Sequence, residues 1–200
     1  LFTLGVCCRN SAINTGPSGN FYTYAELTLD RANDNSSPLF TNQWPAIQCC
    51  NQPVFATFGA VETVDKDSLS FAWGHALSGW NQNISYSSNY AYNHPFQVYY
   101  PGSLSPPYTN PNASPPIGMY FDSETGEAIY TPTRCYEGTV AVVEVKEWRT
   151  DTAGIYRKIG VVRYDKQFIT KQCPDNNPPE VDGPFNYNVC AGSQLCFNVT

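Results

Sequence analysis

Eight cysteines, among them two directly adjacent pairs, constrain this 200-residue chain more than any other feature of its sequence. An even number of cysteines in a chain rich in proline and neutral polar residues is typical of an extracellular protein held by disulfides. Zinc sites favour Cys-x-x-Cys spacing with histidines nearby, whereas this chain has adjacent pairs and only two histidines. We therefore expect disulfides, and they involve Cys7, Cys8, Cys49, Cys50, Cys135, Cys173, Cys190 and Cys196.

The order of the cysteines does not fix how they pair, because eight thiols allow about 105 pairings. We expect local pairing. Two adjacent cysteines bond each other only through a strained turn, which favours separate partners for each member of a pair. The expected disulfides join one of Cys7 or Cys8 to one of Cys49 or Cys50, Cys135 to Cys173, and Cys190 to Cys196.

The charge balance excludes two classes of partner. The chain has 11 Lys and Arg against 17 Asp and Glu, a net charge of −6, whereas nucleic acids and anionic membranes attract proteins with a positive surplus. No apolar run approaches the roughly 18 residues of a membrane helix, and the first residues lack the basic-then-apolar pattern of a signal peptide. We therefore expect no nucleic-acid partner and no membrane insertion, and we interpret the chain as a mature or internal fragment located outside the cell or at its surface.

Apolar and polar residues alternate in short runs, and no long stretch has the apolar spacing of a helix. In residues 21–29, for example, Phe21, Ala25 and Leu27 fall on one face and Glu26 and Thr28 on the other, as in a half-buried strand. A polar connection joins residues 139–148 to residues 155–164 and predicts a long antiparallel hairpin. The other expected strands are residues 54–58, 69–73, 119–121, 128–131 and 167–170.

Residues 86–116 are rich in Tyr, Asn, Ser and Pro without alternation, which predicts a long surface loop or a connection between modules. A second break follows at residues 173–179. We therefore expect an all-β chain of two tandem β-sandwich modules stapled by disulfides. The first covers residues 1–116 and includes the Tyr/Pro-rich loop, and the second covers residues 117–173. Residues 174–200 form a linker and the first strand of a further module, or an exchanged strand.

An acidic segment offers the densest set of hard oxygen ligands in the chain. Glu62, Asp65 and Asp67, together with backbone carbonyls, form part of the oxygen shell that a calcium ion requires. The competing interpretation is a solvated acidic turn that Lys66 partly neutralises. No other cofactor is expected.

Aromatic residues cluster between positions 80 and 100, next to Asn and Ser. Flat rings beside such hydrogen-bonding groups suit the faces of sugars and polymers. The competing interpretation is that the rings cover the edge of a module or pack between modules. The candidate ligand-binding residues are Trp80, Tyr86, Tyr90, Tyr92, Tyr99 and Tyr100.

Catalysis is not expected. His75 lies near Ser78, but the surrounding residues contain neither a Gly-x-Ser-x-Gly elbow nor the histidine pair of a metalloprotease. His94 is the remaining histidine, and two histidines leave few ways to assemble a catalytic triad. We therefore predict that the chain is not an enzyme.

Several short strings, taken in order, resemble the immunoglobulin-like, cadherin-like modules of very large Bacteroidetes surface proteins associated with gliding motility and adhesion. They are CCRN at 7–10, NSSPLF at 35–40, NQP at 51–53, DKDSLSF at 65–71, DSETG at 122–126, YTPT at 130–133 and VKEWR at 145–149. The acidic loop departs from the family pattern, because residues 62–67 lack its glycine and are one residue longer.

This resemblance implies immunoglobulin-like modules in an extracellular, repeat-bearing filament or adhesin that is exported by the type nine secretion system. Its partners would be neighbouring modules or identical subunits in an array, and surface glycans. It also implies glycosylation of Ser68 and Thr152, which lie in Asp-Ser/Thr-apolar triplets. The expected function is structural or adhesive, without catalysis. The alternative is a carbohydrate-binding module that uses the aromatic loop at residues 80–100.

Overall fold

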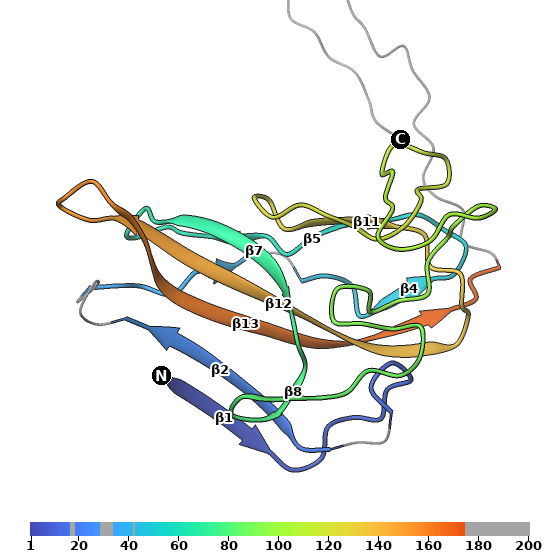
Figure 1. Ribbon diagram of the computed structural model, residues 1–200, viewed down its shortest axis with the longest axis horizontal. Coiled ribbons are helices and arrows are strands. Elements are labelled where there is room, and N and C mark those ends of the chain that lie inside the picture. The colour runs from blue at the N-terminus through green and yellow to red at the C-terminus, as the bar shows by residue number, and fades with distance from the viewer. Residues whose placement is uncertain (17–18, 29–33, 42, 175–200) are drawn as a thin grey trace, which may run out of the picture.

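The computed structural model describes residues 1–16, 19–28, 34–41 and 43–174 (Figure 1). These residues form strands and no helix, which confirms the all-β prediction. Within this part of the chain, therefore, no helix has the length and apolar character needed to cross a membrane. The strands are β1 (Phe2–Val6), β2 (Phe21–Leu27), β3 (Leu39–Phe40), β4 (Ile47–Cys49), β5 (Val54–Thr57), β6 (Ala60–Val61), β7 (Ser68–Gly74), β8 (Leu77–Gly79), β9 (Gln82–Asn83), β10 (Tyr120–Phe121), β11 (Glu127–Tyr130), β12 (Glu137–Thr150) and β13 (Tyr156–Lys171).

The hairpin of β12 and β13 forms the centre of the molecule, as the sequence predicts (Figure 1). Its strands have 14 and 16 residues. In β12 Val140, Val142 and Val143 are all buried, because both faces of this strand are covered. We predicted two strands where β13 is one. The two residues between the predicted strands, Asp165 and Lys166, lie within β13, where Asp165 pairs with Arg9 and Lys166 donates to the Trp44 carbonyl.

The main sheet has eight strands, with a path in the order β7-β12-β13-β2-β8-β9. β1 adds to β2 in antiparallel fashion, and β4 adds to β13 in parallel. Smaller sheets are formed by β10-β11-β5 and by β3-β6. Both ranges that we predicted as modules contribute to the main sheet, β2 and β7 from the first and β12 and β13 from the second. A boundary at residue 116 therefore does not separate two sheets.

Trp44 occupies the centre of the main core and is 1% exposed. Its ring lies 4.7 Å from that of Phe168 on β13 and 4.8 Å from that of Phe58, between centroids. The predicted long loop contributes Phe96 and Val98 to the same core. The structure describes all of residues 84–119 and shows no strand among them, which confirms the prediction of a loop. The burial of Phe96 and Val98 in the core was not predicted.

The disulfide pairing differs from our prediction. Cys49 bonds Cys173 and Cys50 bonds Cys135, so neither of the adjacent cysteines pairs with Cys7 or Cys8, and Cys135 does not pair with Cys173. The cause is a long-range strand contact. The parallel pairing of β4 with β13 aligns Cys49 with Lys171 and brings it beside Cys173. The predicted pair of Cys190 and Cys196 lies outside the described residues.

Cys7 and Cys8 bond each other, which also contradicts the expectation of separate partners. The backbone makes this possible at Cys8, whose φ of 74° is in the left-handed region. This conformation is uncommon for a residue other than glycine and turns the chain sharply after β1. A single residue in the left-handed region is therefore sufficient for this adjacent pair to close.

Candidate functional site

Among the described residues, two hollows combine polar groups with apolar surface and are our candidates for ligand binding. The first, which we call the tyrosine hollow, has a volume of about 390 Å³ and lies in the long loop. Two backbone hydrogen bonds between Ala91 and His94, of 3.0 and 3.1 Å, close a tight turn at its rim. The hollow is lined by Asn89, Tyr90, Ala91, Asn93, His94, Gln97, Val98, Tyr100 and Pro106.

Tyr90 is held in place by polar partners beneath the tyrosine hollow. Its hydroxyl donates to Oε1 of Glu137 at 2.5 Å and accepts from Nη1 of Arg134 at 3.3 Å. Burial, reinforced by the hydrogen bond to Glu137, raises the pKa of Tyr90 to about 12. Glu137 is itself 0% exposed, and burial raises the pKa of its carboxyl. Tyr90 therefore stays a neutral hydroxyl in a fixed orientation.

His94 and Tyr100 form the other aromatic part of the tyrosine hollow, with ring centroids 6.1 Å apart. Burial lowers the pKa of His94, so its imidazole is neutral at neutral pH and offers one donor and one acceptor nitrogen. The Gln97 amide donates to the carbonyl of Asn89 at 2.8 Å and ties the two sides of the loop together. The hollow thus combines aromatic rings with neutral hydrogen-bonding groups.

Of the six aromatic residues predicted to bind ligand, the structure brings only Tyr90 and Tyr100 into this hollow. Tyr92 stacks on His75, with centroids 4.1 Å apart. Tyr86 accepts a hydrogen bond from the backbone amide of Ala76 through its hydroxyl. The two remaining residues are placed elsewhere: Trp80 is 48% exposed and makes an edge contact with Tyr24, and Tyr99 is half-buried outside the lining.

The carboxylates of the predicted calcium segment are occupied by protein groups. Asp67 forms a bidentate ion pair with Arg149, with N–O distances of 2.6 and 2.8 Å, which raises the pKa of the arginine. Glu62 accepts from the backbone amides of Val64 and Asp65, and Asp65 accepts from the amide of Ser36. Among the described residues, no group of three or more His, Cys, Asp or Glu side chains is arranged to hold a metal ion.

Ser68 and Thr152, the predicted glycosylation sites, are both exposed. Ser68 begins β7, and Thr152 lies in the connection between β12 and β13. Both side chains are therefore accessible for modification, which stays a prediction.

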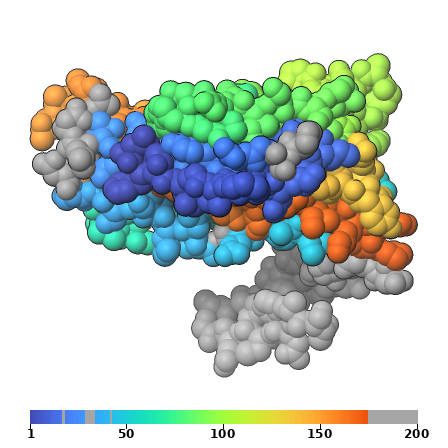
Figure 2. Space-filling model, turned by 90° about the horizontal axis from the view of Figure 1, so that it is seen from below, coloured from blue at the N-terminus to red at the C-terminus, as the bar shows by residue number. Residues whose placement is uncertain are grey.

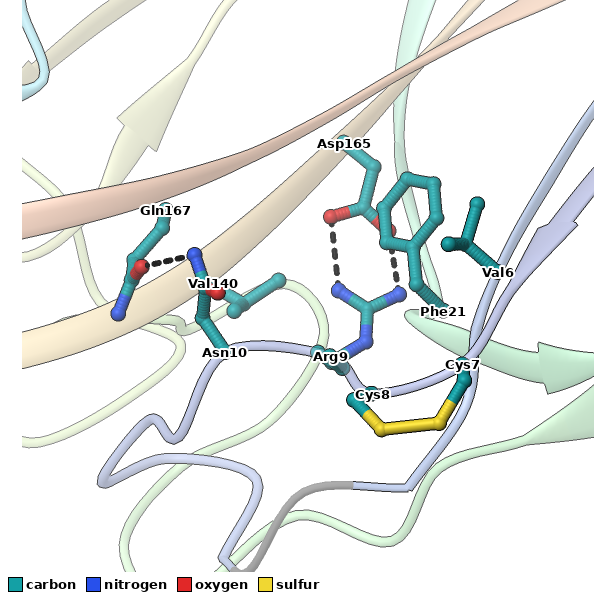
Figure 3. A pocket seen from close by; sticks show the side chains of 9 residues that line it. All are labelled: Val6, Cys7, Cys8, Arg9, Asn10, Phe21, Val140, Asp165 and Gln167. Carbon is teal, nitrogen blue, oxygen red and sulfur yellow. Dashed lines mark hydrogen bonds and ion pairs between the residues drawn. A yellow bond between two sulfur atoms is a disulfide. The ribbon is translucent and has the colours of Figure 1, made fainter.

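The second hollow, which we call the disulfide hollow, has a volume of about 330 Å³ and lies where β1 ends (Figure 3). None of its lining residues except the two cysteines was a predicted site residue. Figure 3 shows the guanidinium group of Arg9 between the Cys7–Cys8 disulfide on one side and the carboxylate of Asp165 on the other. The nine residues that line this hollow are Val6, Cys7, Cys8, Arg9, Asn10, Phe21, Val140, Asp165 and Gln167.

A buried ion pair closes the base of the disulfide hollow. Arg9 contacts Asp165 through two hydrogen bonds of 2.9 and 2.7 Å, and both side chains are 4% exposed. Arg9 also donates to the carbonyl of Leu77 and lies 4.8 Å from the ring centroid of Phe21. Beside the pair, the Asn10 amide donates to Gln167 at 2.7 Å. The only local signal for this site was the string of two cysteines, arginine and asparagine, because Asp165 is 156 residues away in sequence.

Comparisons with protein-family models, curated proteins and solved structures gave no match to this chain. The assignment of function therefore depends on the residues described above.

Proposed function

We propose that this chain is an extracellular structural or adhesive module of a larger, repeat-containing surface protein, and that it has no catalytic role. The observation that carries this proposal is the pair of disulfides at Cys49 and Cys50. These neighbouring residues are bonded to two distant parts of the chain, Cys173 and Cys135. Disulfides of this kind persist outside the cell, where thiols are not kept reduced.

The Cys49–Cys173 bond has a mechanical consequence. It spans 124 residues of sequence, and the Cys50–Cys135 bond lies inside that span. A force that enters on one side of Cys49 and leaves beyond Cys173 is transmitted through the sulfur atoms, so the intervening residues are not extended. Each bond also stabilises the fold by about 2–4 kcal/mol, because it restricts the unfolded chain. Shielding of this kind suits a module in a surface filament or adhesin.

Single-molecule stretching of the full chain between its two ends tests this proposal. With the disulfides intact, we expect the 124-residue span to stay closed. After reduction, the extended chain should be longer by about 430 Å, at about 3.5 Å per residue. Without reductant, the Cys49→Ala/Cys173→Ala variant should lengthen by only about 140 Å, because the Cys50–Cys135 bond still closes 85 residues of that span. Equal extension of the oxidised and reduced chains would contradict the proposal.

Carbohydrate binding at the tyrosine hollow is a second candidate function. The observation that favours it is the convergence of Tyr90, Tyr100 and a neutral His94 beside the Gln97 amide. A glycan array should detect binding that is lost in Tyr100→Ala, since this change removes a ring from the hollow. Tyr92→Ala is the matched control because Tyr92 stacks on His75 outside the hollow. Loss of binding in Tyr92→Ala alone would place the ligand elsewhere.

We further propose the finer features that the family resemblance implies: an immunoglobulin-like module that repeats along the larger protein, export by the type nine system, and glycans on Ser68 and Thr152. The exposure of both side chains supports modification. Peptide mass spectrometry of the protein from its native surface tests this directly. Unmodified peptides at both positions would remove that part of the proposal.

A further inference from the structure

The disulfide hollow has an apolar wall and a polar wall, and its volume suits a small ligand group. The disulfide, Val6 and Phe21 provide apolar surface on the side of β1 and β2, whereas Asn10 and Gln167 provide amide groups on the other side (Figure 3). A volume of about 330 Å³ is at the lower end of the range of small-molecule sites. The part of a ligand that enters the hollow must therefore be small and must have both an apolar face and hydrogen-bonding groups.

The charges in the disulfide hollow cancel. Arg9 and Asp165 neutralise each other through two hydrogen bonds and are almost completely buried. An anionic ligand would have to displace the Asp165 carboxylate from Arg9 and leave a buried charge unpaired, which is unfavourable. The net charge of −6 on the chain further disfavours anions. The hollow is therefore suited to a neutral ligand.

One hydrogen-bond donor in this hollow has no acceptor. Both terminal nitrogens of Arg9 are used by Asp165, but its Nε–H is buried and has no partner among the described residues. In Figure 3 this nitrogen lies on the side of the guanidinium group that faces the disulfide. A buried donor without an acceptor is unfavourable, so a ligand oxygen that reaches it gains more than it would at an exposed donor.

We propose that the disulfide hollow is a binding site for a neutral saccharide, separate from the tyrosine hollow. The apolar C–H face of a sugar ring rests on the disulfide and Phe21. Its hydroxyl groups interact with the amides of Asn10 and Gln167, and one hydroxyl oxygen accepts from Nε of Arg9. The Cys7–Cys8 disulfide thus forms a wall of the site, a role consistent with its exposure and with the absence of any long loop for it to close.

Ligand-observed NMR and calorimetric titration of the full oxidised chain test this site. The probes are neutral oligomers of glucose, mannose, galactose and N-acetylglucosamine, with a sulfated and a uronate oligomer as charged counterparts. We expect a neutral oligomer to bind, and to bind about tenfold more weakly to Asn10→Ala, because one hydrogen-bonding group is lost. Cys7→Ser/Cys8→Ser should weaken binding at least as much, since it opens the wall.

Asn93→Ala is the matched control, because it removes an exposed asparagine from the tyrosine hollow instead. Near-ultraviolet circular dichroism confirms that each variant is folded. The proposal is overturned if no neutral oligomer binds at millimolar concentration, or if the charged oligomers bind more tightly. Binding that is unchanged in both Asn10→Ala and Cys7→Ser/Cys8→Ser but lost in Tyr100→Ala would assign the sugar to the tyrosine hollow and also overturn it.

Discussion

The region around β4 and the region around β1 both contain adjacent cysteines, but they use them in opposite ways. Cys49 and Cys50 fasten two distant segments, at separations of 124 and 85 residues. Cys7 and Cys8 bond only each other and enclose no loop. Two adjacent cysteines therefore form long-range cross-links in one region and an exposed local disulfide in the other. What decides between them is whether a distant strand brings another thiol close.

The β1 region is held instead by buried polar contacts. Arg9 pairs with Asp165 on β13. Asn14, which is 0% exposed, donates to the carbonyl of Val140 and accepts from its amide. β1 itself is exposed along its whole length, and Figure 2 shows the N-terminal segment stretched across one face of the molecule. The side chains of β1 are therefore little buried, and its attachment depends on backbone pairing with β2 and on the residues that follow the strand.

The largest difference between the two regions should come from removing their disulfides. Cys49→Ala/Cys173→Ala should lower the free energy of unfolding by about 4 kcal/mol, because the bond closes a very long loop. Cys7→Ser/Cys8→Ser should change it by less than about 1 kcal/mol, since that bond closes none. Urea unfolding of both variants measures the contrast. Equal losses would show that the local disulfide also holds the fold.

Breaking the buried ion pair should have the next largest effect. Asp165→Asn leaves the Arg9 guanidinium buried without its counter-charge and should destabilise the protein by about 3 kcal/mol. Urea unfolding measures this loss, and Glu124→Gln, at an exposed position in the turn between β10 and β11, is the control. A loss below about 1 kcal/mol would mean that the β1 region is held by other contacts.

Replacing Glu137 should have a smaller effect that depends on pH and that raises the free energy of unfolding instead of lowering it. Burial raises its pKa above the ordinary value of 4.5, so the folded state binds a proton more tightly than the unfolded state. Its contribution is then favourable at low pH and is lost as pH rises through the folded pKa. Glu137→Gln mimics the protonated carboxyl and should stabilise the protein by about 1 kcal/mol, or about 2–4 °C, at pH 7.5. Thermal melts at pH 4 should show no gain, and a gain of equal size at both pH values would contradict this explanation.

The smallest effect is expected on β1. Phe2 is 70% exposed, so Phe2→Ser should change the free energy of unfolding by no more than about 0.5 kcal/mol. Thermal denaturation of the isolated chain checks this. A loss above about 1 kcal/mol would show that β1 contributes packing that its exposure does not reveal.

The strands predicted correctly from the sequence are those with a clear pattern of apolar residues within one short stretch of the chain. The valine-rich run of β12 and its partner were identified because their composition and the polar connection between them lie within one stretch of sequence. β1 was missed although Phe2, Leu4 and Val6 alternate with Thr3 and Gly5, since a short exposed strand gives a weak signal. β3 and β6, with two residues each, give none.

The candidate sites were predicted only in part, because their geometry is set by distant contacts. Tyr90 and Tyr100 were found by composition, but nothing local indicated that Tyr92 would turn towards His75. The disulfide map required the parallel register of β4 against β13, which no local rule supplies. The pairing of Arg9 with Asp165 has the same origin.

The positions of Cys49 and Cys50 also limit the order in which this protein can mature. Two consecutive thiols that must choose different partners are almost equally available to both partners in a disordered chain. Only after β4 has docked on β13 does Cys49 face Cys173 while Cys50 faces Cys135. Correct oxidation therefore requires that the strands assemble first, and a chain oxidised too early needs exchange of its disulfides before it can reach the native fold.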